Sequence, residues 1–149
     1  MSVIPQFLKY AAAFEQAYTS DDWSLAAPFF TDAAVYEAQL PVPLGGRFEG
    51  RAAILGYFKF VLDNFDRRFA SREIGLVSGP REVGDSVWLR GSARYTAAGV
   101  PDLYFELDIH VAFDGDRIRS MEDSYDAKTI ADLQTYLRDH GAKLGIATG

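Results

Sequence analysis

The chain contains no cysteine and only two histidines, His110 and His140, which lie far apart in the sequence. Without cysteine, neither a disulfide framework nor a thiolate metal site can form, so the class of small disulfide-rich secreted proteins is excluded. Two separated histidines also argue against a histidine-rich metal site. We therefore expect the protein to work without a metal ion or another cofactor.

Positive charge is scarce, because 15 lysines and arginines stand against 21 aspartates and glutamates, which gives a formal net charge of −6. Proteins that bind nucleic acid gather Lys and Arg on one face to displace counterions, and this balance disfavours them. Long apolar runs are also absent, and the N-terminal segment has no basic region ahead of an apolar one. These absences predict a cytoplasmic location, with neither nucleic acid nor membrane as a partner.

Aromatic residues, by contrast, are abundant: the 149 residues include 11 Phe, 8 Tyr and 2 Trp, or 14% of the chain. A chain of this length buries most of its apolar surface in one core, and a hydrophobic content of 48% fits a single domain spanning residues 1–149. A small core needs fewer flat side chains than this. The excess indicates either a ligand-sized cavity or a dimer interface.

Helical spacing of apolar residues predicts two long helices in the first half of the chain. The segment from Phe7 to Tyr18 repeats apolar residues along one helical face, and the segment from Arg51 to Phe65 does so more strongly. Between them, the polar residues 19–22 are suited to cap a short helix around Trp23, whose length Pro28 limits.

Period-two patterning dominates the second half. Runs near 72–79, 86–97, 102–113 and 117–125 alternate apolar and polar residues and are separated by short turns containing Gly. This pattern predicts a meander of four antiparallel strands. A shorter strand is expected at 33–37.

Proline and glycine crowd the segment from Pro41 to Gly50, for which we expect an irregular loop. The part from Gly45 to Gly50 lacks the spacing of a phosphate-binding loop, so we interpret it as the rim of a pocket. After the last strand, Asp126 is suited to cap a closing helix that Gly141 ends, with a frayed tail beyond it. Together the elements predict an α+β fold, with about three N-terminal helices on one face of a curved antiparallel sheet and a C-terminal helix.

The order of these elements resembles the nuclear transport factor 2-like superfamily, and within it most closely the SnoaL-like group. The likeness rests on the segment from Asp22 to Tyr36, the loop PVPLGGRFEGRAAI and the ending GDRIRSMEDSYD, and it extends from about Phe7 to about Leu137. It implies a cone-shaped domain with a deep pocket, and a homodimer formed through the outer sheet face. Members of the superfamily include isomerases, cyclases, epoxide hydrolases, dehydratases and non-catalytic binders.

Asp123 is the leading candidate for an acid/base group. It lies in the last predicted strand, where the resemblance implies the catalytic aspartate of SnoaL-like cyclases and limonene-epoxide-hydrolase-like enzymes. A carboxyl group held among aromatic side chains loses hydration, which raises its pKa toward the range useful for proton transfer. The alternative is a surface aspartate, because a β-bulge near Glu122 and Asp126 would turn the side chain outward.

His110 is the candidate partner of Asp123. It belongs to the segment LYFELDIHVAF, which has apolar residues at its odd positions and polar residues, His110 among them, at its even positions. The resemblance implies that a polar residue of this strand faces the late aspartate, and an imidazole titrates where a proton relay is useful. The alternative is a half-exposed histidine held by Glu106 or Asp108.

Limonene-epoxide-hydrolase-like enzymes activate water with an Arg-x-Asp, a Tyr-x-Asn and the late Asp, and Tyr36, Arg90 and Asp123 match these positions. The resemblance implies that Tyr36 and Arg90 steady negative charge, which a guanidinium does well because it stays protonated. For Arg90 the alternative is an exposed arginine of the sheet. Ser92 and Ala38 replace the remaining Asp and Asn, which argues against epoxide hydrolysis.

Large apolar side chains from the expected helices and the first strand are predicted to line the pocket and bind the ligand, or alternatively to fill the core. They are Phe14, Tyr18, Trp23, Phe29, Phe30, Tyr36, Phe58, Leu62 and Phe65.

Two functions are consistent with these residues. The first is a cofactor-independent enzyme that moves a proton in a small, largely apolar and cyclic metabolite, as an isomerase, cyclase or dehydratase does, with Asp123 as acid/base and His110 as relay. The second is a non-catalytic dimeric module of the same fold that binds a hydrophobic ligand or a protein. Only the first function requires the carboxyl group of Asp123.

Overall fold

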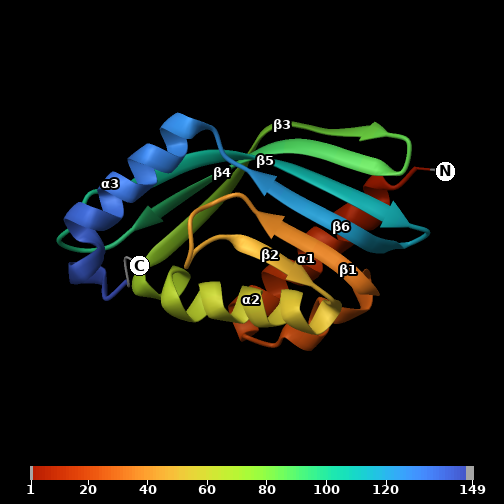
Figure 1. Cartoon of the computed structure of the whole chain (residues 1–149), viewed down its shortest axis with the longest axis horizontal. Coiled ribbons are helices and arrows are strands. Elements are labelled where there is room, and N and C mark those ends of the chain that lie inside the picture. The colour runs from red at the N-terminus through yellow and green to blue at the C-terminus, as the bar shows by residue number, and fades with distance from the viewer. Residues whose placement is uncertain (1, 147–149) are drawn as a thin grey trace.

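The structure, a computed structural model, describes residues 2–146 (Figure 1). The predicted long helices and the four-strand meander are confirmed, and the short second helix takes the form of two consecutive 3-10 turns. The elements are α1 (Ile4–Ser20), η1 (Trp23–Leu25), η2 (Ala27–Phe29), β1 (Phe30–Ala38), β2 (Gly46–Glu49), α2 (Arg51–Asn64), η3 (Asp66–Arg68), β3 (Ser71–Val83), β4 (Ser86–Thr96), β5 (Leu103–Asp114), β6 (Arg117–Ser124) and α3 (Ala127–Leu144).

The strands form one sheet in the order β2-β1-β6-β5-β4-β3. Strands β3 to β6 follow one another as an antiparallel meander. One pair departs from the predicted antiparallel arrangement, because β1 lies parallel to β6, with Ala38 opposite Asp123. The connection between these two strands is long enough to bring β6 back in the same direction as β1, which a tight turn cannot do.

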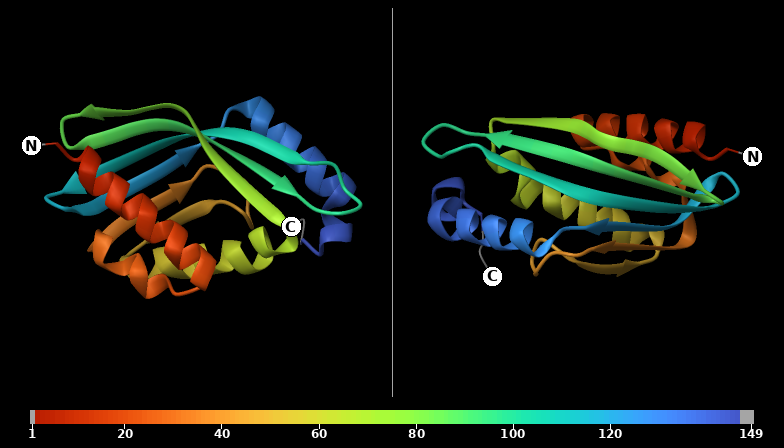
Figure 2. Two further views of the ribbon diagram at one scale, coloured as in Figure 1. Left: turned by 180° about the vertical axis from the view of Figure 1, so that it is seen from behind. Right: turned by 90° about the horizontal axis from the view of Figure 1, so that it is seen from above.

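The sheet is strongly curved, and α1 and α2 cover its concave side (Figure 2). Helix α3 lies at the end of the sheet away from the N-terminus (Figure 1). Two hydrophobic clusters fill the interior: one includes Phe30 and Ile54, and the other includes Tyr95 and Leu137 of α3. The architecture is therefore the predicted α+β cone. Among residues 2–146, no helix combines the length and the apolar character that a bilayer crossing needs.

Helix α1 is held at both ends by distant side chains. At its start, the Glu82 carboxylate of β3 accepts hydrogen bonds from the backbone N–H groups of Val3 (2.7 Å) and Ile4 (3.3 Å). These first N–H groups have no acceptor within the helix, and the side chain of Val3 at the N-cap offers none. At its end, Asp21 adopts a left-handed φ of 57° and its carboxylate pairs with Lys59 of α2 (2.5 Å). These contacts tie α1 to both β3 and α2.

The loop after β1 is more regular than predicted. Gly46–Glu49 forms β2, an edge strand antiparallel to β1. The strand forms because Phe48 packs inward on Tyr57, with ring centroids 4.2 Å apart, while Arg47 on the opposite face pairs with Glu37 at 3.6 Å. Alternation of this kind suits an extended backbone despite the neighbouring glycines.

Helix α3 begins as predicted, with the Asp126 carboxylate accepting from the Thr129 N–H (2.7 Å), but it is longer. Gly141 lies inside the helix and is buried, so the prediction that it ends the helix is wrong. The helix ends at Gly145, whose φ of 72° lies in the left-handed region that glycine adopts at little cost. Most of the predicted frayed tail is therefore ordered, and its final residues 147–149 lie outside the described residues.

Two glycine substitutions test the packing of the turn that leads into β2. An alanine Cβ at Gly45 would lie 1.9 Å from the carbonyl oxygen of Leu40, so Gly45→Ala is expected to lower the free energy of unfolding by about 2 kcal/mol or more. The matched change Gly56→Ala, in α2, meets nothing within 4 Å and is expected to raise it by about 1 kcal/mol. Urea denaturation of both variants measures the difference. Equal effects would contradict this account of the turn.

Candidate functional site

The register of the central strands places Asp123 inside the curved sheet. The odd positions of β5 face the helices, and Val111 and Phe113 are 0% and 1% exposed there. Asp123 stands opposite Ile109, another odd position. Since directly opposed residues share a face of the sheet, the Asp123 side chain points into the interior. The structure does not turn it outward as a surface aspartate.

Tyr36 fixes one side of this carboxyl group, because its hydroxyl donates a hydrogen bond to Oδ2 of Asp123. The pairing of β1 with β6 sets the contact: Ala38 stands opposite Asp123, and Tyr36 lies two residues earlier on the same face. Among residues 2–146, Oδ1 of Asp123 has no hydrogen-bond partner. Every fully buried side-chain nitrogen or oxygen atom in that part of the chain does have one, so Oδ1 is not fully buried and keeps water-accessible surface.

Accessible surface also remains in the middle of β5, on its inner face. Phe105, Leu107 and Ile109 are only half-buried, whereas Leu103 and Val111, at the same face toward the two ends of the strand, are buried. Because β5 lies within the sheet, this surface is reached from the concave side and not from an edge. The name interior hollow is used for the half-buried side chains on this side of the sheet, which are Phe105, Leu107, Ile109, Asp123 and Tyr125.

Burial raises the pKa of Asp123 to about 6, because a deep carboxylate loses its hydration. The Tyr36 hydrogen bond opposes this shift in the pKa, and the neighbouring Glu122 charge adds to it. Burial also raises the pKa of Tyr36 well above its ordinary value, with the Asp123 charge as the next cause. At neutral pH the pair is thus a largely ionised carboxylate beside a neutral phenol, and the carboxylate exchanges its proton near neutrality.

Two further phenols border the same carboxyl group. Burial, followed by the charge of Asp123, raises the pKa of both Tyr57 and Tyr125. Tyr57 is fixed, because its hydroxyl donates to the Leu44 carbonyl oxygen and its ring centroid lies 5.4 Å from that of Tyr36. The Tyr125 hydroxyl has no hydrogen-bond partner among residues 2–146, and it therefore opens to accessible space. Sequence reasoning identified Tyr36 but neither of these two.

A cavity of about 340 Å³ opens nearby, between the segment after β1 and helix α3. Leu44, whose carbonyl oxygen accepts from Tyr57, belongs to its wall. So does Leu40, and the N–H of the preceding Gln39 donates to the Asp123 carbonyl oxygen (2.9 Å). The cavity therefore lies next to the strand ends that carry Asp123. Its lining is mostly apolar and consists of Leu40, Pro41, Val42, Pro43, Leu44, Ile130, Leu133, Gln134, Leu137 and Arg138.

A second buried carboxyl group, that of Asp66, was also missed by sequence reasoning. It is 9% exposed, the Tyr95 hydroxyl donates to it (2.7 Å), and burial raises its pKa to about 6. Arg72, which pairs with Glu15 at 2.9 Å, lies close enough to lower that pKa. The available signal was an acidic residue directly after Phe65, where the buried stripe of α2 ends. Within residues 2–146, no three or more His, Asp or Glu side chains gather as metal ligands would.

His110 lies on the outer face of the sheet. It stands opposite Glu122, and its ring stacks on Trp88 with centroids 3.8 Å apart. The expectation that it faces Asp123 is therefore wrong. The reason is the two-residue period of a strand, since Asp123 shares its face with Ile109 and the residue after Ile109 points the other way.

Arg90 also lies outside, where it pairs with Glu106 (2.9 Å) and Asp108 (3.0 Å). It is the exposed sheet arginine that was the alternative, and it does not reach the interior. Ser92 lies two residues along on the same outer face, opposite Glu106. Neither position of the apparent Arg-x-Asp match therefore points toward Asp123.

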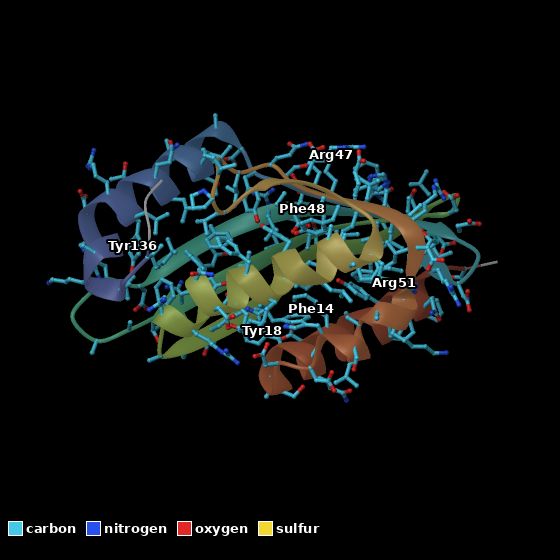
Figure 3. The ribbon with its side chains drawn as sticks, turned by 60° about the horizontal axis from the view of Figure 1, so that its bottom comes forward. Phe14, Tyr18, Arg47, Phe48, Arg51 and Tyr136 are labelled. Atoms are coloured by element: carbon cyan, nitrogen blue, oxygen red, sulfur yellow. The ribbon has the colours of Figure 1, made fainter. Side chains whose placement is uncertain are left out.

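The predicted lining residues fall into two groups. Trp23, Phe30, Phe58 and Leu62 are at most 8% exposed and belong to the hydrophobic core. A ligand would reach them only if the core opened, so the structure does not bring them to the interior hollow. Phe14 and Tyr18 are half-buried and lie between α1 and α2 (Figure 3), with the Phe14 ring 5.2 Å from that of Phe58.

The fold built in this way is similar to that of solved nuclear transport factor 2-like proteins, which is the fold that the resemblance implied. Solved structures match almost the whole chain, although no model of a known protein family and no curated protein matches the sequence. A nuclear transport factor 2-like protein of unknown function from Burkholderia pseudomallei is 16% identical, with a TM-score of 0.67 over 91% of this chain and 98% of that one.

Several other neighbours have a description that concerns an activity or a ligand. An epoxide hydrolase from Mycobacterium tuberculosis, of the limonene-epoxide-hydrolase-like type, is 16% identical, with a TM-score of 0.63 over 95% of this chain and 96% of that one. A protein with a ketosteroid isomerase-like fold from Catenulispora acidiphila, solved with trimethylamine, is 17% identical, with a TM-score of 0.58 over 94% and 95%. At these identities the likeness shows the fold alone.

Asp123 is expected to cost stability at neutral pH. The pKa of Asp123 in the folded protein, about 6, exceeds the ordinary value of 3.8, so ionisation is less favourable in the folded state than in the unfolded state. This difference lowers the free energy of unfolding above pH 6, and the effect disappears as the pH falls toward 3.8. Asp123→Asn should therefore raise the free energy of unfolding at pH 7.5, by up to about 3 kcal/mol, and lose that advantage near pH 4. Urea denaturation at several pH values measures the effect, with Glu122→Gln as the control. A loss of stability that is equal at every pH would contradict the burial argument.

Proposed function

We propose that this protein is an enzyme that moves a proton in a small, largely apolar and cyclic molecule bound in the interior hollow. One observation supports the proposal above the others. The Asp123 carboxyl group is deep, one of its oxygens is held by Tyr36, and the other is open to accessible space. A carboxylate that is anchored on one side and free on the other is arranged to receive a proton from a ligand.

The chemistry follows from the surroundings of the carboxyl group. Ionised Asp123 accepts a proton from a carbon next to a carbonyl group, and the protonated acid then returns it to another position of the same molecule. The free hydroxyl of Tyr125 is available to donate to the oxygen on which negative charge develops. A bound ligand would cover the half-buried apolar residues of β5 and so displace the water that competes for the proton. Isomerase, cyclase and dehydratase reactions share this first step.

The proposal differs from the sequence hypothesis in its supporting residues. His110 and Arg90 are assigned no part in the chemistry, because both side chains point away from the hollow. Tyr36 becomes a positioning residue, since its hydroxyl holds Asp123 and not the ligand. Epoxide hydrolysis is disfavoured, because Arg90 points to the outer face and β4 carries no second carboxylate that could activate water with Asp123.

The rival function is a non-catalytic dimeric module that binds a hydrophobic ligand or a partner. The apolar cavity between α3 and the segment after β1 favours it, because that cavity has no carboxyl group in its lining.

A homodimer through the outer sheet face fits either function. Trp88 and Tyr104 are 39% and 46% exposed on that face, where they offer apolar contact area to a second copy.

Deuterium exchange tests the catalytic proposal without a known substrate. The wild-type protein in D2O is incubated with a panel of small cyclic ketones, and NMR follows the loss of the C–H signals next to the carbonyl group. We expect exchange that increases as the pH rises through about 6, where Asp123 ionises, and that is lost in Asp123→Asn. Glu122→Gln, next in sequence but on the outer face, should exchange normally. Ligand binding without any exchange would favour the rival function.

The dimer is tested at its exposed aromatic residue. Trp88→Glu places a charge on the outer face and should shift the protein from dimer to monomer in analytical ultracentrifugation. The matched change Leu8→Glu alters a residue of α1 that is 54% exposed and should leave the dimer intact. A monomeric wild-type protein would reject this interface.

A further inference from the structure

The interior is short of positive charge. Among residues 2–146, the charged groups next to α1 and at the hollow are the carboxyl groups of Asp123, Asp66 and Glu15 and one cation, Arg72. Arg72 is already engaged, because two of its nitrogens donate to Glu15 (2.9 and 3.3 Å) and its guanidinium lies 4.1 Å from the centre of the Tyr18 ring. Two carboxylates in the interior therefore remain without a full counter-charge.

Asp123 is the less compensated of the two. Asp66 accepts from Tyr95 and has Arg72 nearby, whereas Asp123 has one phenol donor and forms no ion pair among residues 2–146. Buried carboxylates in folded proteins are normally paired, because the lost hydration is otherwise not replaced. The open Oδ1 of Asp123 is therefore a position where a cation would be stabilised.

The walls around Asp123 favour the same kind of ligand. The rings of Phe105 and Tyr125, which are both half-buried, lie 6.1 Å apart. The faces of aromatic rings carry partial negative charge and attract cations, most strongly where water is excluded. The net charge of −6 adds a long-range attraction for a cation.

We propose that the ligand of the interior hollow is a small apolar molecule carrying one basic nitrogen, bound as a cation with Asp123 as its counter-ion. This inference names the ligand class of the site proposed above, and it rests on a small molecule entering that site. A cationic nitrogen also acidifies neighbouring C–H bonds, so the contact is compatible with proton transfer to Asp123.

Three probes with the same ring but different charge test the ligand class: cyclohexylmethylamine, cyclohexylmethanol and cyclohexanecarboxylate. Isothermal titration calorimetry with the full chain at pH 7.5 should show the amine binding at least about tenfold more tightly than the alcohol, which corresponds to one close charge pair. The carboxylate should not bind. Equal affinities of amine and alcohol, or no binding of the amine at millimolar concentration, would overturn the inference.

The pH dependence adds a readout that needs no variant. With the pKa of Asp123 at about 6, about one tenth of it is ionised at pH 5, so the amine should bind about tenfold more weakly there than at pH 7.5. The phenols that face Asp123, from Tyr36, Tyr57 and Tyr125, have raised pKa values and stay neutral throughout. Affinity for the alcohol should not fall. An amine affinity that does not change with pH would argue against a carboxylate anchor.

Variants assign the effect to one carboxyl group. Asp123→Asn should remove the preference for the amine and keep the affinity for the alcohol, whereas Glu122→Gln, whose side chain lies on the outer face, should keep the preference. Asp66→Asn separates the other group that titrates in this range and should have the smaller effect, because Arg72 already offsets its charge. Retention of the preference in Asp123→Asn overturns the inference.

The inference and the proposed function fail separately. If ketone exchange depends on Asp123 but the amine preference is absent, the ligand class is wrong and the enzyme proposal stands. If the amine preference depends on Asp123 but no probe exchanges, the site binds cations and the enzyme proposal falls.

Discussion

The parallel pairing of β1 with β6 is the constraint on which the interior depends. It places Ala38 opposite Asp123 and so brings the Tyr36 hydroxyl to the carboxyl group. The N–H of Gln39, just past the end of β1, donates to the Asp123 carbonyl and extends the same register by one step. A slip of one residue would turn Asp123 to the outer face and bring Glu122 to the inner one. The phenol and the carboxyl group therefore meet through backbone geometry and not through the choice of a flexible side chain.

The buried carboxyl groups lower the stability of the interior, and the aromatic packing around them raises it. Asp123 and Asp66 both have pKa values raised to about 6 by burial, so the folded chain carries two desolvated carboxyl groups at neutral pH. The aromatic packing around them opposes that cost, for example through the edge-to-face contact of Tyr36 with Phe58, whose centroids lie 5.4 Å apart.

The parts of the fold that were predicted correctly depend on local periodicity. The stripes of α1 and α2 and the four strands of the meander repeat every three to four or every two residues, and such patterns need no knowledge of distant contacts. The fold family and the Tyr36 and Asp123 candidates came from the resemblance. The helix end at Gly145 and not Gly141 depends on packing, because Gly141 is buried under its neighbours and the helix gains by continuing past it.

What the sequence did not provide was the relation between strands. Alternation alone places His110 on the polar face of β5, but only the register with β6 shows that Asp123 is on the other face. The same limit applied to Arg90, whose face became clear from its partners Glu106 and Asp108. Asp66 went unnoticed because it follows a helix end, where no periodic pattern tells which way a side chain points.

The contact of Glu82 with the first turn of α1 has a consequence for the order in which the chain becomes structured. The backbone N–H groups of Val3 and Ile4 receive their acceptor from a residue near the far end of β3, almost eighty positions downstream. On a ribosome, the start of this helix therefore emerges long before its stabilising carboxylate has been made. The first turn of α1 therefore gains its Glu82 acceptor only when β3 has formed and packed against the helix, so the N-terminal turn is expected to be among the last parts to become ordered.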